Sequence, residues 1–210
     1  MIKRVIFDVD GTLIRDINFK PFVERSFTKV GIDPAKADIF MQSVKQYEKE
    51  NTCYNEILYQ LFFEEKLGES LINRNWLKIY FEELKGACKK NPKIEKMIYD
   101  LYYDYELVIL SNYFEESQRN RLKVMGLNTY FDSYYGEKII KPYPEAYMDA
   151  CGKYEPSECV IVGDDPYLDI EVPKKMGFKT IYVNNRDNLQ VGKTVKNVEE
   201  ITPQLIKKLH

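Results

Sequence analysis

The stretch IKRVIFDVDGTLI, residues 2–14, joins an apolar run to two acidic residues. Residues 2–7 consist largely of β-branched and aromatic side chains, which is typical of a strand buried on both faces. Asp8 and Asp10 follow this run, and Gly11 comes directly after them. Carboxylates placed together at the end of a buried strand repel one another unless a cation neutralises them. The stretch therefore indicates either an exposed edge strand with ordinary turn acids or a site for a cation.

The composition is that of a soluble globular protein. The chain has 210 residues, of which 44% are hydrophobic and 30% charged, and its formal net charge is -2. This length suits one large domain or a core with a smaller inserted domain. The charge balance gives no indication of a nucleic-acid or anionic-membrane partner. Because the sequence shows neither a signal segment nor about 18 consecutive apolar residues, we expect a cytoplasmic protein without a membrane partner. The oligomeric state stays open.

Cysteine and histidine usage restricts the chemistry. The four cysteines are scattered and form no C-x-x-C pair, and His210 is the one histidine. Structural zinc and a histidine-dependent nucleophile are therefore not expected, and the thiols should be free in a reducing compartment. Catalysis would have to use carboxylates, lysine, hydroxyl groups, backbone amides or a metal ion.

Strands and helices alternate over most of the chain. Strands are predicted at residues 2–7, 106–110, 159–162 and 179–183, with a weaker one near 134–136. Helical patterns cover about 91–105, 115–126 and 143–154, and a short helix capped by Thr202 closes the chain. This order predicts an α/β fold with a doubly wound, mainly parallel sheet.

The segment between the first two strands has a different character. It contains no convincing strand, and its apolar residues recur at helical spacing with Gly68 and Gly86 as stop signals. The residues at helical spacing are Ile57, Leu58, Leu61 and Phe62, then Trp76, Leu77, Tyr80, Phe81 and Leu84. Because this segment is too long for a crossover, we assign residues 16–88 to an inserted all-α cap and residues 1–15 and 89–210 to the core.

Polar residues follow each predicted strand at the sheet edge where ligands bind in open α/β folds. They are Asp8 and Asp10 after the first strand, Ser111 and Asn112 after the second, and Asp164 and Asp165 after the third, with Asp169 one turn later and Lys141 before a helix. Such an acid cluster fits Mg²⁺, and the metal together with the lysine would attract an anionic ligand. A carboxylate can attack phosphorus, and a second one two residues on can act as acid and base.

Four short motifs resemble those of the haloacid dehalogenase-like (HAD) hydrolase superfamily in order and spacing. They are DVDGTL, LSN, KP and VGDDPYLD, and the resemblance extends over nearly the whole chain. The helical insert is similar to the small α-helical cap that this superfamily places after its first motif. The resemblance implies a phosphatase with an α/β core and a cap that closes over the substrate.

The resemblance also implies a role for each matching residue. Asp8 would be the nucleophile that becomes phosphorylated, and Asp10 the general acid and base. Mg²⁺ would be held by the Asp8 side chain, the Asp10 backbone carbonyl and Asp164. The phosphoryl group would be bound by Ser111, Asn112 and Lys141. Asp169 would be a supporting acid, and the role of Asp165 stays open.

Three points depart from the pattern or compete with it. Pro173 lies where related sequences usually have small helical residues, so the last helix should begin late, kink or break there, which could shift Asp169. Lys138 competes with Lys141 for the lysine role. Ser111 on its own could equally cap the next helix.

The function expected from the sequence is Mg²⁺-dependent hydrolysis of a small phosphate monoester through an aspartyl-phosphate. Three alternatives stay open: a 2-haloacid dehalogenase, a phosphomutase, and a non-catalytic module that accepts phosphate for signalling. Asp10 argues against the dehalogenase. The absence of a histidine in the cap argues against the phosphomutase, and the large cap argues against the signalling module. The partner would be a small phosphorylated metabolite, and sugar phosphates, nucleoside monophosphates and phosphoglycolate all stay possible.

Overall fold

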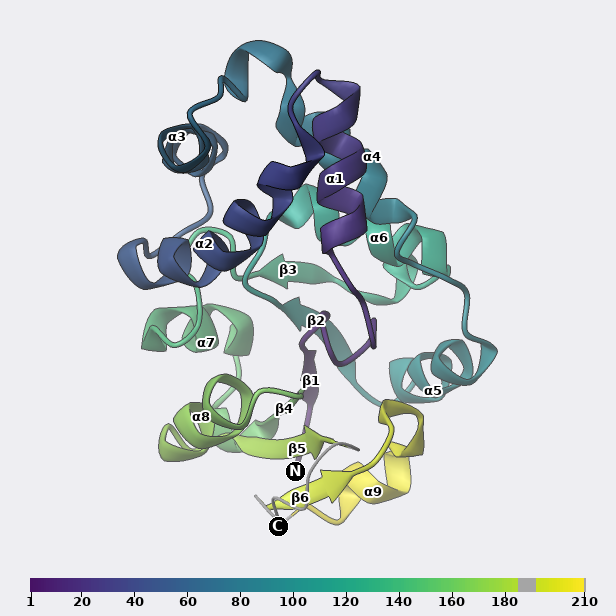
Figure 1. Cartoon of the computed structure of the whole chain (residues 1–210). Helices are drawn as coiled ribbons and strands as arrows, with labels where there is room; N and C mark the ends of the chain where they lie inside the picture. Colours follow the sequence, from purple (N-terminus) through teal and green to yellow (C-terminus); the bar gives the residue numbers. More distant parts are fainter. Residues whose placement is uncertain (185–191, 210) are drawn as a thin grey trace.

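A six-stranded parallel sheet forms the centre of the computed structural model, which describes residues 1–184 and 192–209 (Figure 1). The strands follow the order β3-β2-β1-β4-β5-β6. Their bounds are β1 Arg4–Phe7, β2 Glu106–Leu110, β3 Ser133–Tyr135, β4 Cys159–Gly163, β5 Lys179–Val183 and β6 Lys193–Val195. The α/β fold and the predicted strands are confirmed, and β6 is an addition that three residues with a single buried side chain did not signal.

Strand β1 lies inside the sheet, because it pairs with β2 on one side and with β4 on the other. Arg4 lies opposite Glu106 of β2 and opposite Cys159 of β4. All four residues of β1 are buried, as expected for a strand with helices on both faces of its sheet. The first acidic motif therefore cannot belong to an exposed edge strand.

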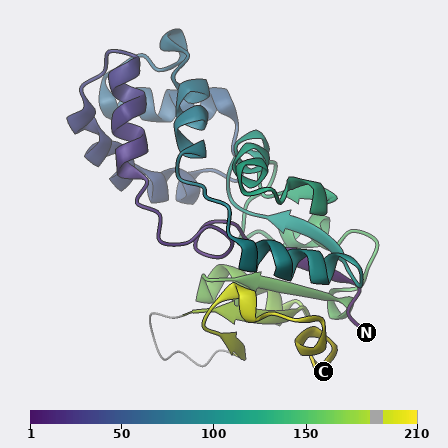
Figure 2. The ribbon, with the colours of Figure 1, turned by 90° about the vertical axis from the view of Figure 1, so that its right-hand side faces the viewer.

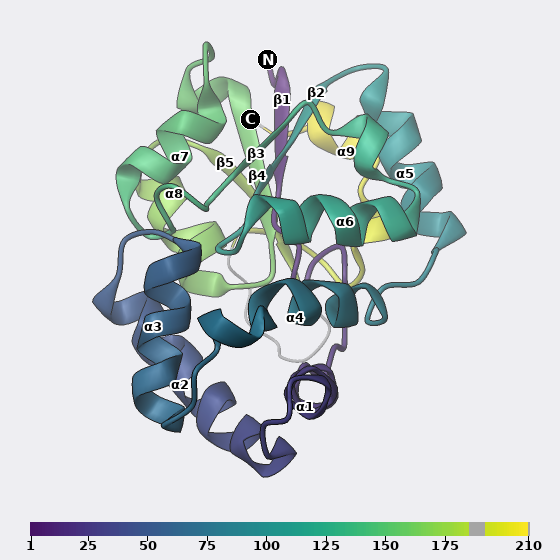
Figure 3. The same cartoon turned by 90° about the horizontal axis from the view of Figure 1, so that it is seen from above.

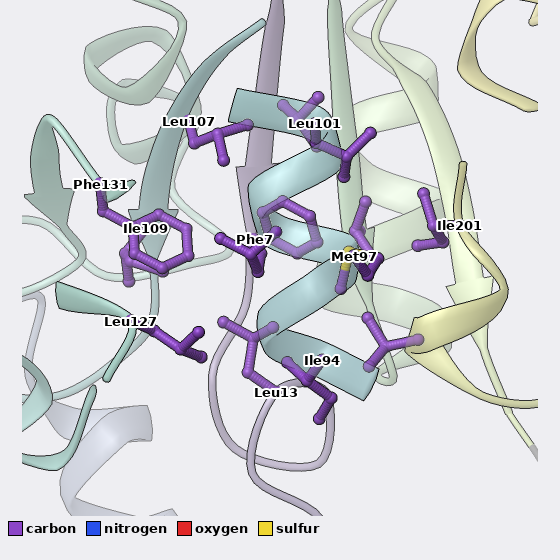
Figure 4. Close-up of a cluster of buried hydrophobic side chains, with 14 of the residues drawn as sticks. Phe7, Leu13, Ile94, Met97, Leu101, Leu107, Ile109, Leu127, Phe131 and Ile201 are labelled. Atoms are coloured by element: carbon purple, nitrogen blue, oxygen red, sulfur yellow. The ribbon is translucent and has the colours of Figure 1, made fainter. Parts of the chain in front are cut away.

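Helices cover both faces of the sheet. On one face, Phe7, Leu107 and Ile109 pack against α5, and Figure 4 shows Met97 and Leu101 of that helix pointing at them. On the other face, α7 and α8 cover alternate residues of the same strands. The helices of the core are α5 Pro92–Tyr102, α6 Glu115–Met125, α7 Pro144–Cys151, α8 Val172–Lys175 and α9 Pro203–Lys207.

Side-chain caps begin two of these helices, and Thr202 is the cap expected from the sequence. The Asn91 side chain accepts hydrogen bonds from the backbone amides of Lys93 and Ile94 at the start of α5. The Thr202 hydroxyl accepts one from the Leu205 amide at the start of α9. These contacts satisfy amides that a helix leaves unpaired at its first turn.

Four helices form a separate layer above the sheet edge (Figure 2). They are α1 Lys20–Lys29, α2 Ala37–Glu50, α3 Glu56–Leu67 and α4 Trp76–Lys85, and no strand lies between them. Gly68 ends α3 in the left-handed conformation, with φ of 62°, and Gly86 follows α4 as expected. The helical insert is confirmed, and its division at residues 16 and 88 stays a proposal.

The buried face of α3 differs from the expected one. Ile57, Leu58 and Leu61 are exposed, whereas Tyr59 and Phe63 are buried in the centre of the cap. The helix is apolar around most of its circumference, so spacing alone could not choose a face. The aromatic side chains of Tyr59 and Phe63 both contact Phe40 of α2, and this burial of aromatic area favours the observed orientation.

The loop between α2 and α3 joins the cap to the core away from the two chain connections. The Tyr54 amide donates to the Glu137 carbonyl at 2.7 Å, and the Ile140 amide donates to the Thr52 carbonyl at 2.9 Å. The Tyr54 ring also packs on Phe114, with 5.2 Å between ring centres. Viewed from above, α4 of the cap lies beside α6 of the core (Figure 3). Among the described residues, no helix has both the length and the apolar character needed to span a membrane.

Candidate active site

The polar residues predicted to meet at one sheet edge do so. Asp8 follows β1, Ser111 follows β2 and Asp164 follows β4, and β1 lies between the other two strands. The three residues line a cavity of about 490 Å³ between core and cap, together with Asp10 and Lys141. That volume is within the range of small-molecule sites.

Lys141 forms a buried ion pair with two carboxylates. Its Nζ lies 2.9 Å from Asp8 Oδ1 and 2.7 Å from Asp169 Oδ1, and all three side chains are buried. Burial raises the pKa of Asp8, and the nearby Asp169 adds to this while Lys141 opposes it. Burial alone would lower the pKa of Lys141, but the charges of Asp169 and Asp8 raise it. Lys141 is therefore a permanent cation at this site.

Three carboxylates are close enough to share a metal ion. One oxygen of each of Asp8, Asp164 and Asp169 lies within 4.8 Å of the others. Carboxylate oxygens are the donors that Mg²⁺ prefers, and one lysine charge does not neutralise three acids. The donor set therefore fits a hard divalent cation. The side chain of Asp10 is not in this group.

Glycines allow these acids to approach the backbone. Gly11 has φ of 88°, and a Cβ at this position would lie 2.1 Å from Asp164 Oδ2. A Cβ on Gly163 would lie 2.2 Å from Asp169 Cγ. The glycine in the first motif is thus required for two reasons, its left-handed backbone and the close approach of Asp164.

Asn112 holds the backbone of Lys141. Its Oδ1 accepts from the Lys141 amide at 2.7 Å, and its Nδ2 donates to the Lys141 carbonyl at 2.9 Å. Because both ends of the amide are used in this way, the side chain of Asn112 positions the lysine. A role for Asn112 in phosphate binding, as the sequence suggested, would have to come from its backbone.

Ser111 lies in the cavity but does not cap α6. Its hydroxyl accepts from Gln118 Nε2 at 2.9 Å. The amide of Glu115, the first residue of α6, donates to Glu137 Oε2 at 2.6 Å. The helix N-terminus therefore has a carboxylate partner from the segment before Lys141, which was not expected. Ser111 keeps its place as the cavity hydroxyl after β2.

Arg121 is the residue at this site that sequence reasoning missed. Its Nη1 donates to Asp10 Oδ2 at 3.0 Å, its Nη2 contacts Asp10 Oδ1, and the residue is 1% exposed. Burial opposes its charge, but Asp10 raises the pKa of this guanidinium. The available signal was spacing: Gln118 and Arg121 lie on the same face of α6 as the buried Leu122 and Met125, and a buried arginine needs an acidic partner.

The remaining predictions for this region have clear outcomes. Lys138 is exposed and Lys141 buried, which favours Lys141. The Asp165 carboxylate accepts hydrogen bonds from the amides of Tyr167 and Leu168, so it caps the turn that follows.

That turn is a π-helix at Pro166–Glu171, and the regular helix α8 begins only at Val172, next to Pro173. The late start is as expected, yet Asp169 still reaches Lys141.

Comparisons with known proteins agree with this arrangement. The family model of haloacid dehalogenase-like hydrolases matches residues 2–177. A Clostridium perfringens protein with the provisional name pyrophosphatase PpaX is 30% identical over 190 residues, covering 86% of this chain and 83% of the relative. Magnesium-bound HAD-hydrolase YfnB from Bacillus subtilis has a TM-score of 0.72 at 19% identity, covering 98% of this chain and 99% of the other. L-2-haloacid dehalogenase from Xanthobacter autotrophicus has a TM-score of 0.70 at 16% identity, covering both chains fully. This chain is therefore an enzyme that belongs to the haloacid dehalogenase-like hydrolases.

Proposed function

We propose that this hydrolase is a Mg²⁺-dependent phosphatase that transfers the phosphoryl group of a small monoester to Asp8. The observation that carries the proposal is the placement of Lys141 between Asp8 and Asp169, with Asp164 close enough to share a cation. With a divalent cation bound, such a site would attract a dianionic phosphoryl group and keep a carboxylate beside it. The name of the relative PpaX supports phosphoryl chemistry as well.

Each residue has a defined role in this proposal. Asp8 attacks phosphorus in line with the ester oxygen, so that the P–O bond breaks as the aspartyl-phosphate forms. Asp10 gives a proton to the departing alcohol and then takes one from the water that hydrolyses the aspartyl-phosphate. Lys141 and Ser111 bind the oxygens of the phosphoryl group.

Mg²⁺ fits the same residues. Asp8, the Asp10 backbone carbonyl and Asp164 would hold it, and Asp169 would keep Lys141 in place. When bound, the metal offsets charge on the phosphoryl oxygens and on the acids. The four cysteines form no disulfide within the described residues, which supports a cytoplasmic location for the enzyme, with a phosphorylated metabolite as its partner.

The observed geometry favours this function over the alternatives. A dehalogenase has no use for a buried three-acid group beside its nucleophile, or for a second aspartate at position 10. A phosphomutase of this type usually has a histidine-containing basic group in the cap, and the one histidine of the chain, His210, lies outside residues 16–88. A regulatory phospho-acceptor would not need a cap that encloses a cavity of about 490 Å³.

Turnover of p-nitrophenyl phosphate with Mg²⁺ tests the proposal. We expect release of nitrophenol that EDTA abolishes and added Mg²⁺ restores. Rapid acid quenching should trap phosphate on Asp8, identified by mass spectrometry of the peptide. Hydrolysis that is insensitive to EDTA would remove the metal from the mechanism. A stable phospho-aspartate without turnover would favour the regulatory alternative.

A further inference from the structure

The cap supplies only two charged side chains to the cavity among the described residues. Both come from α2: Lys45 is exposed to solvent, whereas Glu48 is half-buried at the cavity wall. Most of the remaining lining from the cap is aromatic, including Phe40, Tyr59 and Tyr80. In a mainly apolar pocket, the few polar groups determine which ligand fits and how it is oriented. Glu48 is therefore placed to discriminate between leaving groups.

Glu48 is held in position by the loop that joins the cap to the core. Its Oε1 accepts a hydrogen bond from the Tyr54 hydroxyl at 2.9 Å. The Tyr54 amide donates to the Glu137 carbonyl at 2.7 Å, a few residues before the phosphate-binding Lys141. Glu48 is thus tied to the core through Tyr54 and keeps a defined place relative to Lys141.

Glu48 lines the same cavity as Asp8, Ser111 and Lys141. Burial raises its pKa, while the Tyr54 hydroxyl and the charges of Lys141 and Lys45 favour the anion. Glu48 therefore contributes a carboxylate from the cap to the cavity that Asp8 and Lys141 line from the core.

We propose that Glu48 selects leaving groups that carry hydroxyl donors and disfavours anionic leaving groups such as a second phosphate. The inference rests on the proposed phosphatase function and adds a substrate class to it. One oxygen of Glu48 is occupied by Tyr54, which leaves the other to accept a hydrogen bond from the substrate. Tyr113, whose hydroxyl is buried, adds a second polar group to the cavity lining.

Charge repulsion supplies the discrimination. A half-buried carboxylate beside a leaving phosphate costs more than the same pair in water, because the effective dielectric constant is lower. Lys45 is exposed, so solvent screens its positive charge, and this charge offsets little of the repulsion between Glu48 and a leaving phosphate. A sugar phosphate instead offers hydroxyl donors to Glu48 and apolar C–H faces to the aromatic rings. The cavity therefore suits a sugar-like monoester better than pyrophosphate.

The test compares glucose 6-phosphate with inorganic pyrophosphate, with p-nitrophenyl phosphate as a reference that has no donor in its leaving group. We expect Glu48→Gln to lower kcat/KM for glucose 6-phosphate about tenfold or more and to raise it for pyrophosphate, because the hydrogen-bond acceptor weakens and the charge disappears. The reference substrate should change by less than about threefold. Glu50→Gln, on an exposed position of the same helix, is the matched control.

Where turnover of glucose 6-phosphate or pyrophosphate is slow, their inhibition of p-nitrophenyl phosphate hydrolysis compares the two ligands instead. The inhibition constants of both phosphates are measured against p-nitrophenyl phosphate, and Tyr54→Phe should shift their ratio in the same direction as Glu48→Gln. A ratio that Glu48→Gln leaves unchanged, or a wild-type preference for pyrophosphate, would overturn the inference while the phosphatase function stands. Absence of all phosphatase activity in the wild type would instead reject the proposed function itself.

Discussion

The guanidinium group of Arg121 pairs with both carboxylate oxygens of Asp10 in the wall of the active-site cavity. Gln118, one turn earlier on α6, accepts from Arg121 at 3.0 Å and donates to Ser111 at 2.9 Å. The proposed acid and base is thus connected through one helix to the proposed phosphate-binding hydroxyl. A fork of two parallel hydrogen bonds fixes orientation as well as charge.

Replacement of Arg121 by lysine should lower kcat with little effect on KM. Lysine keeps the charge but cannot form the two-point contact, so Asp10 loses its orientation. A small misplacement of a catalytic group can reduce the rate about 100-fold, and we expect a decrease of about 10-fold to 100-fold in steady-state kinetics. Arg119→Lys is the control, because Arg119 is exposed on the same helix and pairs with Glu115. An unchanged kcat in Arg121→Lys would show that Asp10 needs no such support.

Asp8→Asn should abolish turnover and leave the fold intact. The substitution keeps the size of the side chain and a hydrogen-bond acceptor for Lys141, but asparagine cannot form the aspartyl-phosphate. The loss should exceed about 1,000-fold, as expected when a nucleophile is removed. Circular dichroism checks the fold, and Asp149→Asn, on the exposed side of α7, serves as the control. Residual activity of about one tenth would count against Asp8 as the nucleophile.

Lys141→Met should destabilise the metal-free protein and make its stability depend on Mg²⁺. The substitution leaves Asp8 and Asp169 buried without their shared cation, and breaking a buried ion pair in this way costs about 3–5 kcal/mol. A divalent ion at the same carboxylates would offset part of that cost. Differential scanning fluorimetry should therefore show a larger rise in Tm on addition of Mg²⁺ for the variant than for the wild type. An equal rise in both would indicate that the metal binds away from Lys141.

The sheet and the convergence of the acids could be predicted from sequence because both follow from local patterns. The runs that became β1, β2 and β4 are nearly continuous in apolar residues, and parallel pairing brings the residues that follow them to one edge. Asp8 and Asp164 meet for that reason alone. The short strand β6 has one buried residue in three, and a pattern of that length cannot be distinguished from a loop.

Contacts between distant side chains could not be predicted in the same way. Nothing in the sequence pairs Arg121 with Asp10, because the contact depends on how α6 is rotated against the sheet. The orientation of α3 was missed for a similar reason, since its exposed and buried faces are both apolar. Asn112 looked like a phosphate ligand from its position after β2, but the chain path before α7 brings the Lys141 backbone to its amide.

The apparent affinity for Mg²⁺ should increase with pH. Burial raises the pKa of Asp8, so its carboxyl group keeps a proton at a pH where an ordinary aspartate has lost it. Metal binding must then displace that proton, and affinity can rise up to about tenfold per pH unit while the group is protonated. Isothermal titration in buffers of different ionisation enthalpy measures both the affinity and the proton release. A pH-independent affinity with no proton release would show that Asp8 is already ionised before the metal arrives.

Gly11→Ala should impair metal binding far more than Gly68→Ala, although both glycines have positive φ. Alanine at either position costs about 1 kcal/mol for its left-handed backbone. At Gly68 the new methyl group meets no atom within 4 Å, whereas at Gly11 it would lie 2.1 Å from Asp164 Oδ2. Asp164 must then move away from Asp8, so the Mg²⁺ activation constant should rise strongly in Gly11→Ala and stay near the wild-type value in Gly68→Ala. Equal activation constants in the two variants would contradict a shared metal at Asp8 and Asp164.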